Sequence, residues 1–269
     1  MKNHLNQTQI EQYHRDGFLV LEEFLSPIWL KRLRQTTEAF VEESRKVEHS
    51  DKVFDVEPDH TNENPRLRRL NNPSDQDETY WEFSSQSEIV DLAEDILGPD
   101  IKFHHSKLNF KFPHGGEEVK WHQDIQFWPH TNYDLITIGV YLENVVKGQG
   151  EMGFIPRSHS GPLFDQYEKD IWRGYIQSAD LPDIEAETAI FPTGKAGTVT
   201  IHNCRTIHGS YLTIHHIEGR CCFKLTLRQM LLPTLISSGK QNTVNTLLGV
   251  RFHAGLGTTR APVLSLRQK

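Results

Sequence analysis

A histidine and an aspartate stand two residues apart in the segment Trp121-His122-Gln123-Asp124. On a β-strand, side chains two residues apart point to the same face, so His122 and Asp124 can converge on one point. A second imidazole from a distant strand would complete a set of two histidines and one carboxylate. Such a set suits non-haem Fe(II), because three ligands on one face leave three positions open.

We predict that His208, in Ile207-His208-Gly209-Ser210, is the second imidazole. His202 is the next candidate because it ends a predicted strand, whereas His215 and His216 lie in a predicted exposed loop. The His-X-Asp tripeptide is a weak signal by itself, since a hydrogen-bonded core histidine explains it more simply. The choice among the histidines therefore depends on their context.

Bulky side chains surround the tripeptide, and Phe127 and Trp128 follow it closely. They indicate that the Asp124 carboxylate is buried, and a buried carboxylate needs a partner or a metal. Arg220 begins a predicted strand after His208, and a β-hairpin would bring it back beside that histidine. A guanidinium group pairs bidentately with a carboxylate, as a bound keto-diacid would require. The alternative for Arg220 is a surface salt bridge.

Two kinds of secondary structure are predicted to position these residues: helices in the first part of the chain and β-strands after it. Helices are predicted in the first hundred residues, where Asn6 with Gln9, Ser26 with Pro27, and Ser87 supply helix-start signals. Short apolar runs separated by turn residues follow, and they are typical of a sandwich or barrel. The predicted strands cover residues 18–21, 101–112, 135–142, 153–156, 189–191, 197–202 and 221–227.

The segment from residue 42 to residue 78 is polar and lacks apolar periodicity. A long irregular segment of this kind is either disordered or a functional lid. In a lid, Arg66, Arg68 and Arg69 would meet an anionic substrate or cosubstrate. A solvated basic turn is the alternative, and it needs no ligand.

Composition excludes several classes of protein. The chain has 269 residues and a formal net charge of −7, which argues against general nucleic-acid binding. It contains no apolar run of membrane-spanning length, and its first residues lack an apolar signal core. The three cysteines, Cys204, Cys221 and Cys222, are too few and too clustered for a disulfide framework and fit a reducing cytosol. We therefore expect a cytoplasmic protein that acts on a small molecule, away from membranes.

The motifs together resemble the phytanoyl-CoA dioxygenase family of Fe(II)/2-oxoglutarate oxygenases over most of the chain. The resemblance rests on Tyr13-X-X-Asp16-Gly17 with the following strand, Leu97-Gly98-Pro99, His122-Gln123-Asp124, Gly150 to His159, and His208-Gly209-Ser210 with Arg220. It implies a mainly β fold, with a double-stranded β-helix (jelly-roll) core and flanking helices. We expect one domain over residues 1–269, with a helical part at about 1–100, a core at about 101–235 and a C-terminal extension at about 236–269.

The resemblance also implies roles for individual residues. Iron would be held by His122, Asp124 and His208. The cosubstrate 2-oxoglutarate would be bound by Arg220, Ser210, Gln123, Lys107 and Asn109. The residues predicted to meet the substrate are Arg66, Arg68, Phe127, Trp128 and Arg157.

The chain departs from the family pattern at Pro156-Arg157-Ser158-His159, where the family usually has Pro-Gly-Ser-His. Arg157 lacks the conformational freedom of glycine, so we expect a differently shaped loop there. The presence of Asp124 disfavours halogenation, because related halogenases replace this carboxylate with a small residue.

The expected reaction is oxidation of a substrate C–H bond, most simply hydroxylation, with O2 and 2-oxoglutarate consumed and succinate and CO2 released. One alternative is a jelly-roll protein that binds a metal or ligand without turnover. Another is a zinc hydrolase with the same three ligands, which Arg220 disfavours because hydrolysis needs no such anchor.

Overall fold

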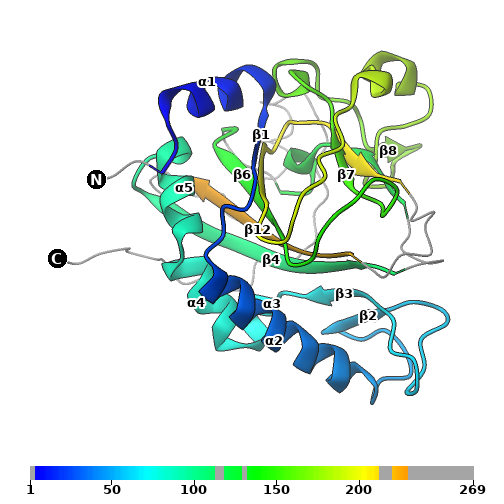
Figure 1. Ribbon diagram of the computed structural model, residues 1–269. Helices are drawn as coiled ribbons and strands as arrows, with labels where there is room; N and C mark the ends of the chain where they lie inside the picture. The colour runs from blue at the N-terminus through cyan, green and yellow to red at the C-terminus, as the bar shows by residue number, and fades with distance from the viewer. Residues whose placement is uncertain (1–3, 113–117, 129–131, 212–219, 230–269) are drawn as a thin grey trace, which may run out of the picture.

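The computed structural model describes residues 4–112, 118–128, 132–211 and 220–229, the last of these as backbone. Two antiparallel β-sheets face each other, and helices flank the larger one (Figure 1). The predicted jelly-roll class is confirmed. The predicted extension at residues 236–269 lies outside the described residues, so the division into parts stays a prediction.

The first elements form as their local signals predict. Helix α1 (Gln7–Asp16) begins with a capping box. The Gln9 N–H donates to Oδ1 of Asn6, and the Asn6 N–H donates to Oε1 of Gln9. The helix ends at Gly17, whose φ of 82° is a backbone conformation that favours glycine. Strand β1 (Phe18–Leu21) follows directly and joins the edge of the larger sheet.

Four further helices follow α1 and precede the long strands: α2 (Pro27–Ser44), α3 (Pro73–Gln76), α4 (Glu78–Gln86) and α5 (Glu88–Leu97). Figure 1 shows α2 and α4 on the side of β4 that faces away from β7. Leu33 of α2, Phe83 of α4 and Leu92 of α5 are fully buried in one cluster with strand residues such as Ile138. Burial of this apolar face is the main force that fixes the large sheet.

The larger sheet has the strand order β1-β10-β6-β12-β4-β3-β2. Its long members are β4 (Ile101–Lys111), β6 (Leu135–Tyr141), β10 (Val199–Asn203) and β12 (Arg220–Gln229). Every residue of β6 is buried, as expected for a strand covered on both faces. Strand β12 lies between β4 and β6, and Arg220 pairs with Lys111.

Within the region 42–78, the prediction of a long irregular segment is wrong. Strands β2 (Phe54–Val56) and β3 (Leu67–Asn71) form an antiparallel pair there, and β3 pairs with β4. Leu67 and Leu70 are fully buried on the core side. These strands are too short for sequence periodicity to reveal them, and the other partner of β3 is β4, where Asn109 pairs with Arg69 from far along the chain.

The smaller sheet contains β5 (Val119–His122), β11 (His208–Ser210) and β7 (Met152–Phe154), with β11 in the centre. A separate hairpin consists of β8 (Tyr167–Glu168) and β9 (Ile171–Trp172). The predicted strand at 189–191 is reduced to one bridge between Ile190 and Phe154. Among the described residues, no helix has the length and apolar character needed to cross a membrane.

Candidate active site

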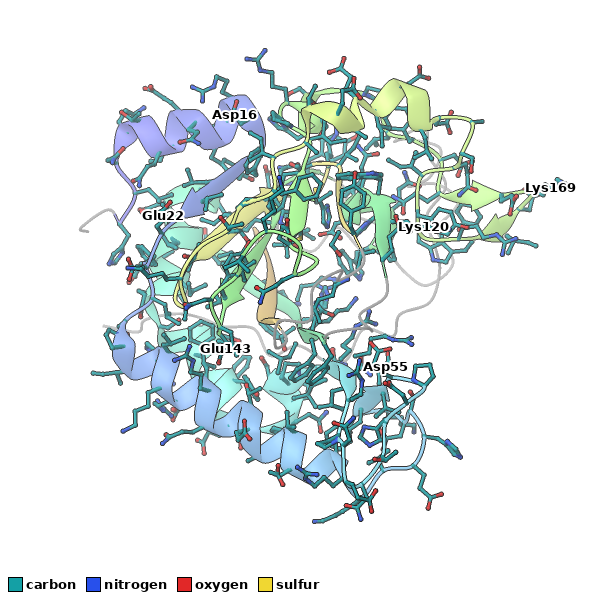
Figure 2. The ribbon with its side chains drawn as sticks, turned by 45° about the vertical axis from the view of Figure 1, so that its right-hand side comes forward. Asp16, Glu22, Asp55, Lys120, Glu143 and Lys169 are labelled. Carbon is teal, nitrogen blue, oxygen red and sulfur yellow. The ribbon has the colours of Figure 1, made fainter. Side chains whose placement is uncertain are left out.

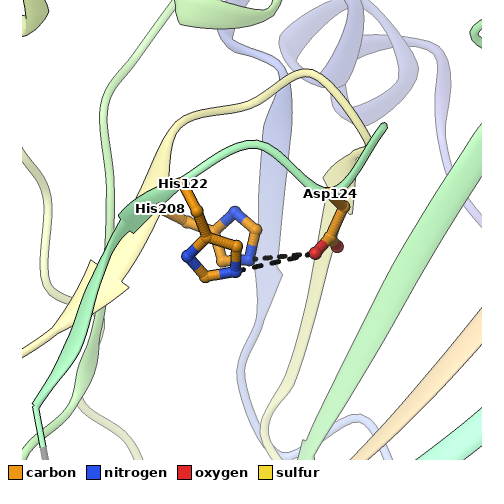
Figure 3. A group of neighbouring side chains, drawn as sticks. All are labelled: His122, Asp124 and His208. Carbon is orange, nitrogen blue, oxygen red and sulfur yellow. Dashed lines mark ion pairs between the residues drawn. The ribbon is translucent and has the colours of Figure 1, made fainter. Parts of the chain in front are cut away.

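The predicted metal ligands meet where β5 pairs with β11. His122 and His208 are direct partners across the two strands, and their ring centroids lie 4.1 Å apart. Asp124 follows β5 in the short 3-10 helix η1 (Asp124–Gln126). Its Oδ1 atom lies 3.6 Å from Nε2 of His122 and 3.7 Å from Nε2 of His208, as Figure 3 shows.

Backbone carbonyl groups set the orientation of both rings. Nδ1 of His122 donates to the carbonyl oxygen of Lys120 at 2.8 Å, and Nδ1 of His208 donates to that of Thr206 at 2.9 Å. A carbonyl only accepts, so each ring carries its hydrogen on Nδ1. Both Nε2 atoms are thereby left with a lone pair that points toward Asp124, which is the arrangement a metal requires.

The second carboxylate oxygen of Asp124 is held from behind. Oδ2 accepts a hydrogen bond from Oγ1 of Thr137 at 2.9 Å and lies 3.3 Å from Nε2 of His202. His202, the alternative third ligand, thus contacts Oδ2, whereas the other two histidines face Oδ1. Burial alone would raise the pKa of Asp124, but the surrounding imidazoles, His208 first, hold this pKa well below its ordinary value whenever they carry a proton in place of a metal.

The donor set fits a divalent metal ion. One ligand atom from each of His122, Asp124 and His208 lies within 4.8 Å of the others, and all three residues are buried. Two neutral imidazole nitrogens and one carboxylate oxygen form the ligand set that is typical of non-haem Fe(II). A buried carboxylate that faces the Nε2 atoms of two buried imidazoles is well suited to such an ion.

Gly209 allows the two ligand-bearing strands to approach each other. A Cβ atom at this position would lie 2.7 Å from the carbonyl oxygen of Val119 and 3.2 Å from the Trp121 ring. Any larger residue would push β11 away from β5. The glycine next to His208 therefore serves the close packing of the site.

A pocket opens beside His208 on the side of the larger sheet. It is lined by Arg68, Arg69, Asn109, Phe110, Lys111, Glu118, Val119, Met152, His208, Gly209 and Ser210. In Figure 2, Lys120 marks β5 and Asp55 marks β2, and the two elements lie one above the other on the same side of the molecule. Three cationic side chains and one acidic side chain line this pocket, which suits an anion, although Arg68 also pairs with Glu57 at 3.5 Å and with Asp55 at 4.0 Å.

Several predicted cosubstrate residues lie at this pocket. Ser210 and Asn109 line it, and Nε of Arg69 donates to Oδ1 of Asn109 at 3.1 Å. Lys107 is two residues before Asn109 on β4 and does not contribute to the lining. The backbone of Arg220 lies opposite Lys111, at the pocket end of β12, and its side chain is outside the described part.

Gln123 does not face the cosubstrate pocket. Its Nε2 atom donates to the carbonyl oxygens of Pro162 and Arg205, and its Oε1 atom accepts from the backbone of Phe164. These three backbone groups engage the amide, and Gln123 is not among the residues that line the pocket, so its contact with 2-oxoglutarate stays a prediction. Gln123 frames the site by fixing the loops around it, because neighbouring residues on an extended segment point in opposite directions.

Aromatic side chains form a wall beside the ligands. The Phe127 ring lies 5.7 Å from that of His122 and 5.0 Å from that of Trp172 in β9. Trp128 packs at 4.5 Å from His105, whose pKa is lowered by burial and by the nearby charge of Lys107. The sequence analysis missed Trp172, His105, Lys111 and Thr137, because only the strand pairing brings them to the site.

Two of the predicted substrate residues lie away from the pocket. Arg66 pairs with Asp59 at 2.9 Å and lies over the Phe112 ring. Arg157 is exposed and adopts φ 65°, the left-handed conformation that the glycine of the family pattern would take. The loop contacts α1 where the Arg157 N–H donates to the Asp16 carbonyl, and the predicted difference in loop shape stays a prediction.

A buried triad of this kind between the sheets of a jelly roll defines a non-haem metal centre. The family model for phytanoyl-CoA dioxygenase (PhyH) matches residues 13–212. The chain belongs to this family, and it is a 2-oxoglutarate-dependent dioxygenase that uses iron. The family resemblance inferred from the motifs is thereby confirmed.

Two relatives and one solved structure illustrate the similarity. The chain is 31% identical to a probable alpha-ketoglutarate-dependent hypophosphite dioxygenase of Stutzerimonas stutzeri, covering 75% of this chain and 71% of that protein. It is 30% identical to an L-proline trans-4-hydroxylase of Streptomyces griseoviridis, covering 81% and 85%. The structure of EctD from S. alaskensis with 2-oxoglutarate and 5-hydroxyectoine has a TM-score of 0.68 at 22% identity, covering 85% and 78%.

Proposed function

We propose that His122, Asp124 and His208 hold Fe(II), and that the enzyme hydroxylates a small polar molecule. When bound, the iron supplies the activation of O2 that is coupled to oxidation of 2-oxoglutarate and of the substrate. The observation that carries the proposal is the convergence of two Nε2 atoms and Oδ1 of Asp124 within 4.8 Å. The chain's own contribution is to bind, orient and shield the reactants.

The cosubstrate would bind in the pocket beside His208. Ser210 is buried next to this ligand, and Lys111, only 4% exposed, lies on the opposite wall. A carboxylate entering there would meet a hydroxyl group and cationic side chains in a partly water-excluded space, where charged hydrogen bonds are strong. Arg220 remains the proposed anchor of the far carboxylate, supported by its register opposite Lys111.

The substrate would approach from the aromatic side of the triad. Phe127, against His122, and Trp172 form a wall there that would exclude water from the reacting atoms. Hypophosphite and L-proline, named in the activities of two relatives, are both small and charged. A small polar or charged substrate is consistent with these relatives and with the cationic character of the neighbouring pocket. We also propose that the enzyme is cytoplasmic, supported by Cys204, which is buried and forms no disulfide bond.

The test begins with an anaerobic titration of the protein with Fe(II) and 2-oxoglutarate, in which we expect a weak visible charge-transfer band. Admission of O2 should then release succinate. Asp124→Ala is the matched variant and should show neither signal while keeping the fold. A folded wild-type protein without the band, or succinate release that persists in Asp124→Ala, would contradict the proposed site.

The substrate class is tested by a panel of small molecules at saturating 2-oxoglutarate. Hypophosphite, L-proline and ectoine represent the relatives, and each is scored by substrate-dependent succinate release and by product mass. A product heavier by one oxygen atom supports hydroxylation. Metal-dependent hydrolysis without O2 would instead favour the hydrolase alternative.

A further inference from the structure

We propose that Thr137 and His202 act together as positioning residues that fix Asp124 as a one-oxygen metal ligand. Both side chains contact Oδ2, so Oδ1 alone is presented to the two histidine Nε2 atoms. The inference rests on the proposed ligand set of His122, Asp124 and His208. It assigns a role to two residues of the larger sheet, whereas His122 and His208 belong to the smaller sheet.

Strand register creates the pair. Thr137 of β6 and His202 of β10 are direct partners across two antiparallel strands, so their side chains project from the same face. Thr137 is 3% exposed and His202 is fully buried. The larger sheet thus places two hydrogen-bonding groups at one point, beneath a ligand carried by a segment that follows the smaller sheet.

The contacts restrict what the carboxylate can do. The backbone next to Asp124 is fixed by the hydrogen bond from the Ile125 N–H to the Cys204 carbonyl oxygen. The carboxylate group would still be able to rotate about the Cβ–Cγ bond of Asp124. A freely rotating carboxylate can bind a divalent ion through either oxygen or through both. Two donors on Oδ2 oppose this, because binding through Oδ2 would break buried hydrogen bonds to a charged group.

Attachment through one oxygen matters for this class of enzyme. The cosubstrate and O2 need the positions at the ion that the protein leaves open. A second oxygen from Asp124 would compete for one of those positions. Thr137 and His202 would therefore protect both the affinity for the metal and the access of 2-oxoglutarate to it.

The alternative role is structural only, since cross-strand pairs also stabilise sheets. Thr200 offers a matched control, because it lies on β10 two residues before His202 and is fully buried. No hydrogen-bond partner of its Oγ1 atom is seen in the described part of the chain. A Thr→Val change at 200 therefore repeats the chemistry of a Thr→Val change at 137 without touching Asp124.

The experiment measures the affinity of the metal-free, full-length protein for Co(II) by calorimetry, and then the affinity of the Co(II) form for 2-oxoglutarate. Thr137→Val and His202→Leu remove the donors, whereas Thr137→Ser and His202→Gln keep one. Thermal melts of the metal-free variants report the fold separately.

We expect Thr137→Val and His202→Leu each to weaken Co(II) binding by about 10- to 100-fold, the usual effect of losing a group that orients a ligand. Thr137→Ser, His202→Gln and Thr200→Val should stay within about threefold of wild type on the same basis. The loss of 2-oxoglutarate affinity should follow the same order. If His202→Leu fails to fold, Thr137→Val decides, because valine has the shape of threonine.

Three results would overturn the inference. The first is that Thr137→Val binds Co(II) as tightly as wild type, or loses no more affinity than Thr200→Val. A collapse of binding in every His202 variant with Thr137→Val unaffected would make His202 a ligand instead. A wild-type protein that does not bind Co(II) would refute the proposed ligand set itself, and the positioning role with it.

Discussion

Replacing Gly209 by alanine tests how closely the two ligand-bearing strands must approach. The added Cβ would lie 2.7 Å from the Val119 carbonyl oxygen, whereas ordinary contact begins at 3.4 Å. The difference is 0.7 Å, and it must be absorbed by backbone, because the obstructing atom belongs to β5. We expect β11 to move away from β5 and to carry the adjacent His208 with it.

Such a shift has two measurable costs. Forcing an extra methyl group into a packed interior typically costs about 1–3 kcal/mol of stability. A displacement larger than about 0.5 Å exceeds the tolerance of a preorganised site. We therefore expect about a tenfold or greater loss of metal affinity, which corresponds to about 1.4 kcal/mol or more.

The assay combines urea unfolding of the metal-free protein with calorimetric titration of Co(II). Gly161→Ala is the control, since its added Cβ would lie 3.3 Å from the Ser158 carbonyl oxygen and φ is −81°. That neighbour needs to give way by only a small amount. If Gly209→Ala matches wild type in both measurements, the argument from strand approach is refuted.

Further predictions concern the metal, one loop and one thiol. Co(II) at one hundred times its dissociation constant should raise the free energy of unfolding by about 2.7 kcal/mol, and Asp124→Ala should abolish this gain; equal protection of the variant would count against the ligand set. Since φ of residue 157 is 65°, Arg157→Gly should leave the free energy of unfolding unchanged or raise it by up to about 1 kcal/mol. Arg157→Val should lower the free energy of unfolding by about 1–2 kcal/mol. A urea melt in which the Val variant is more stable than the Gly variant would contradict this. Burial raises the pKa of the Cys204 thiol well above its ordinary value, so iodoacetamide at pH 8 should modify Cys204 only after unfolding; peptide mapping that finds it alkylated in the native protein would refute this.

Local signals in the sequence were sufficient for α1, α2 and α5 and for the proposed metal ligands, whereas α3 and α4 were not predicted. The capping box of Asn6 and Gln9 lies within one helical turn, and His122 and Asp124 are two residues apart. Such patterns depend on neighbours in the chain, so they survive without knowledge of the fold. His208 was predicted correctly as the third member of the group because its segment matched a family motif.

Features that depend on distant pairing were not predictable in the same way. The hydrogen bond of Thr137 to Asp124 depends on the register of β6 against β10 and on the facing of two sheets. Strand β3 looked irregular because its partner β4 lies far along the chain. The hydrogen bonds of the Gln123 amide were not predictable either, since the loops that bind it, at residues 162–164 and 205, follow much later in the sequence.

The hydrogen bonds from the two imidazole rings to backbone carbonyl oxygens have a consequence for sequence variation. Each ring is oriented by a main-chain oxygen two residues earlier, at positions 120 and 206, and every amino acid supplies that oxygen. The side chains at these positions are thus available for other tasks: the ammonium group of Lys120 lies 4.1 Å from the centre of the Tyr175 ring, and the Thr206 hydroxyl donates to the Gly17 carbonyl. Substitutions at positions 120 and 206 would change contacts around the site but leave the orientation of the two histidine rings unchanged.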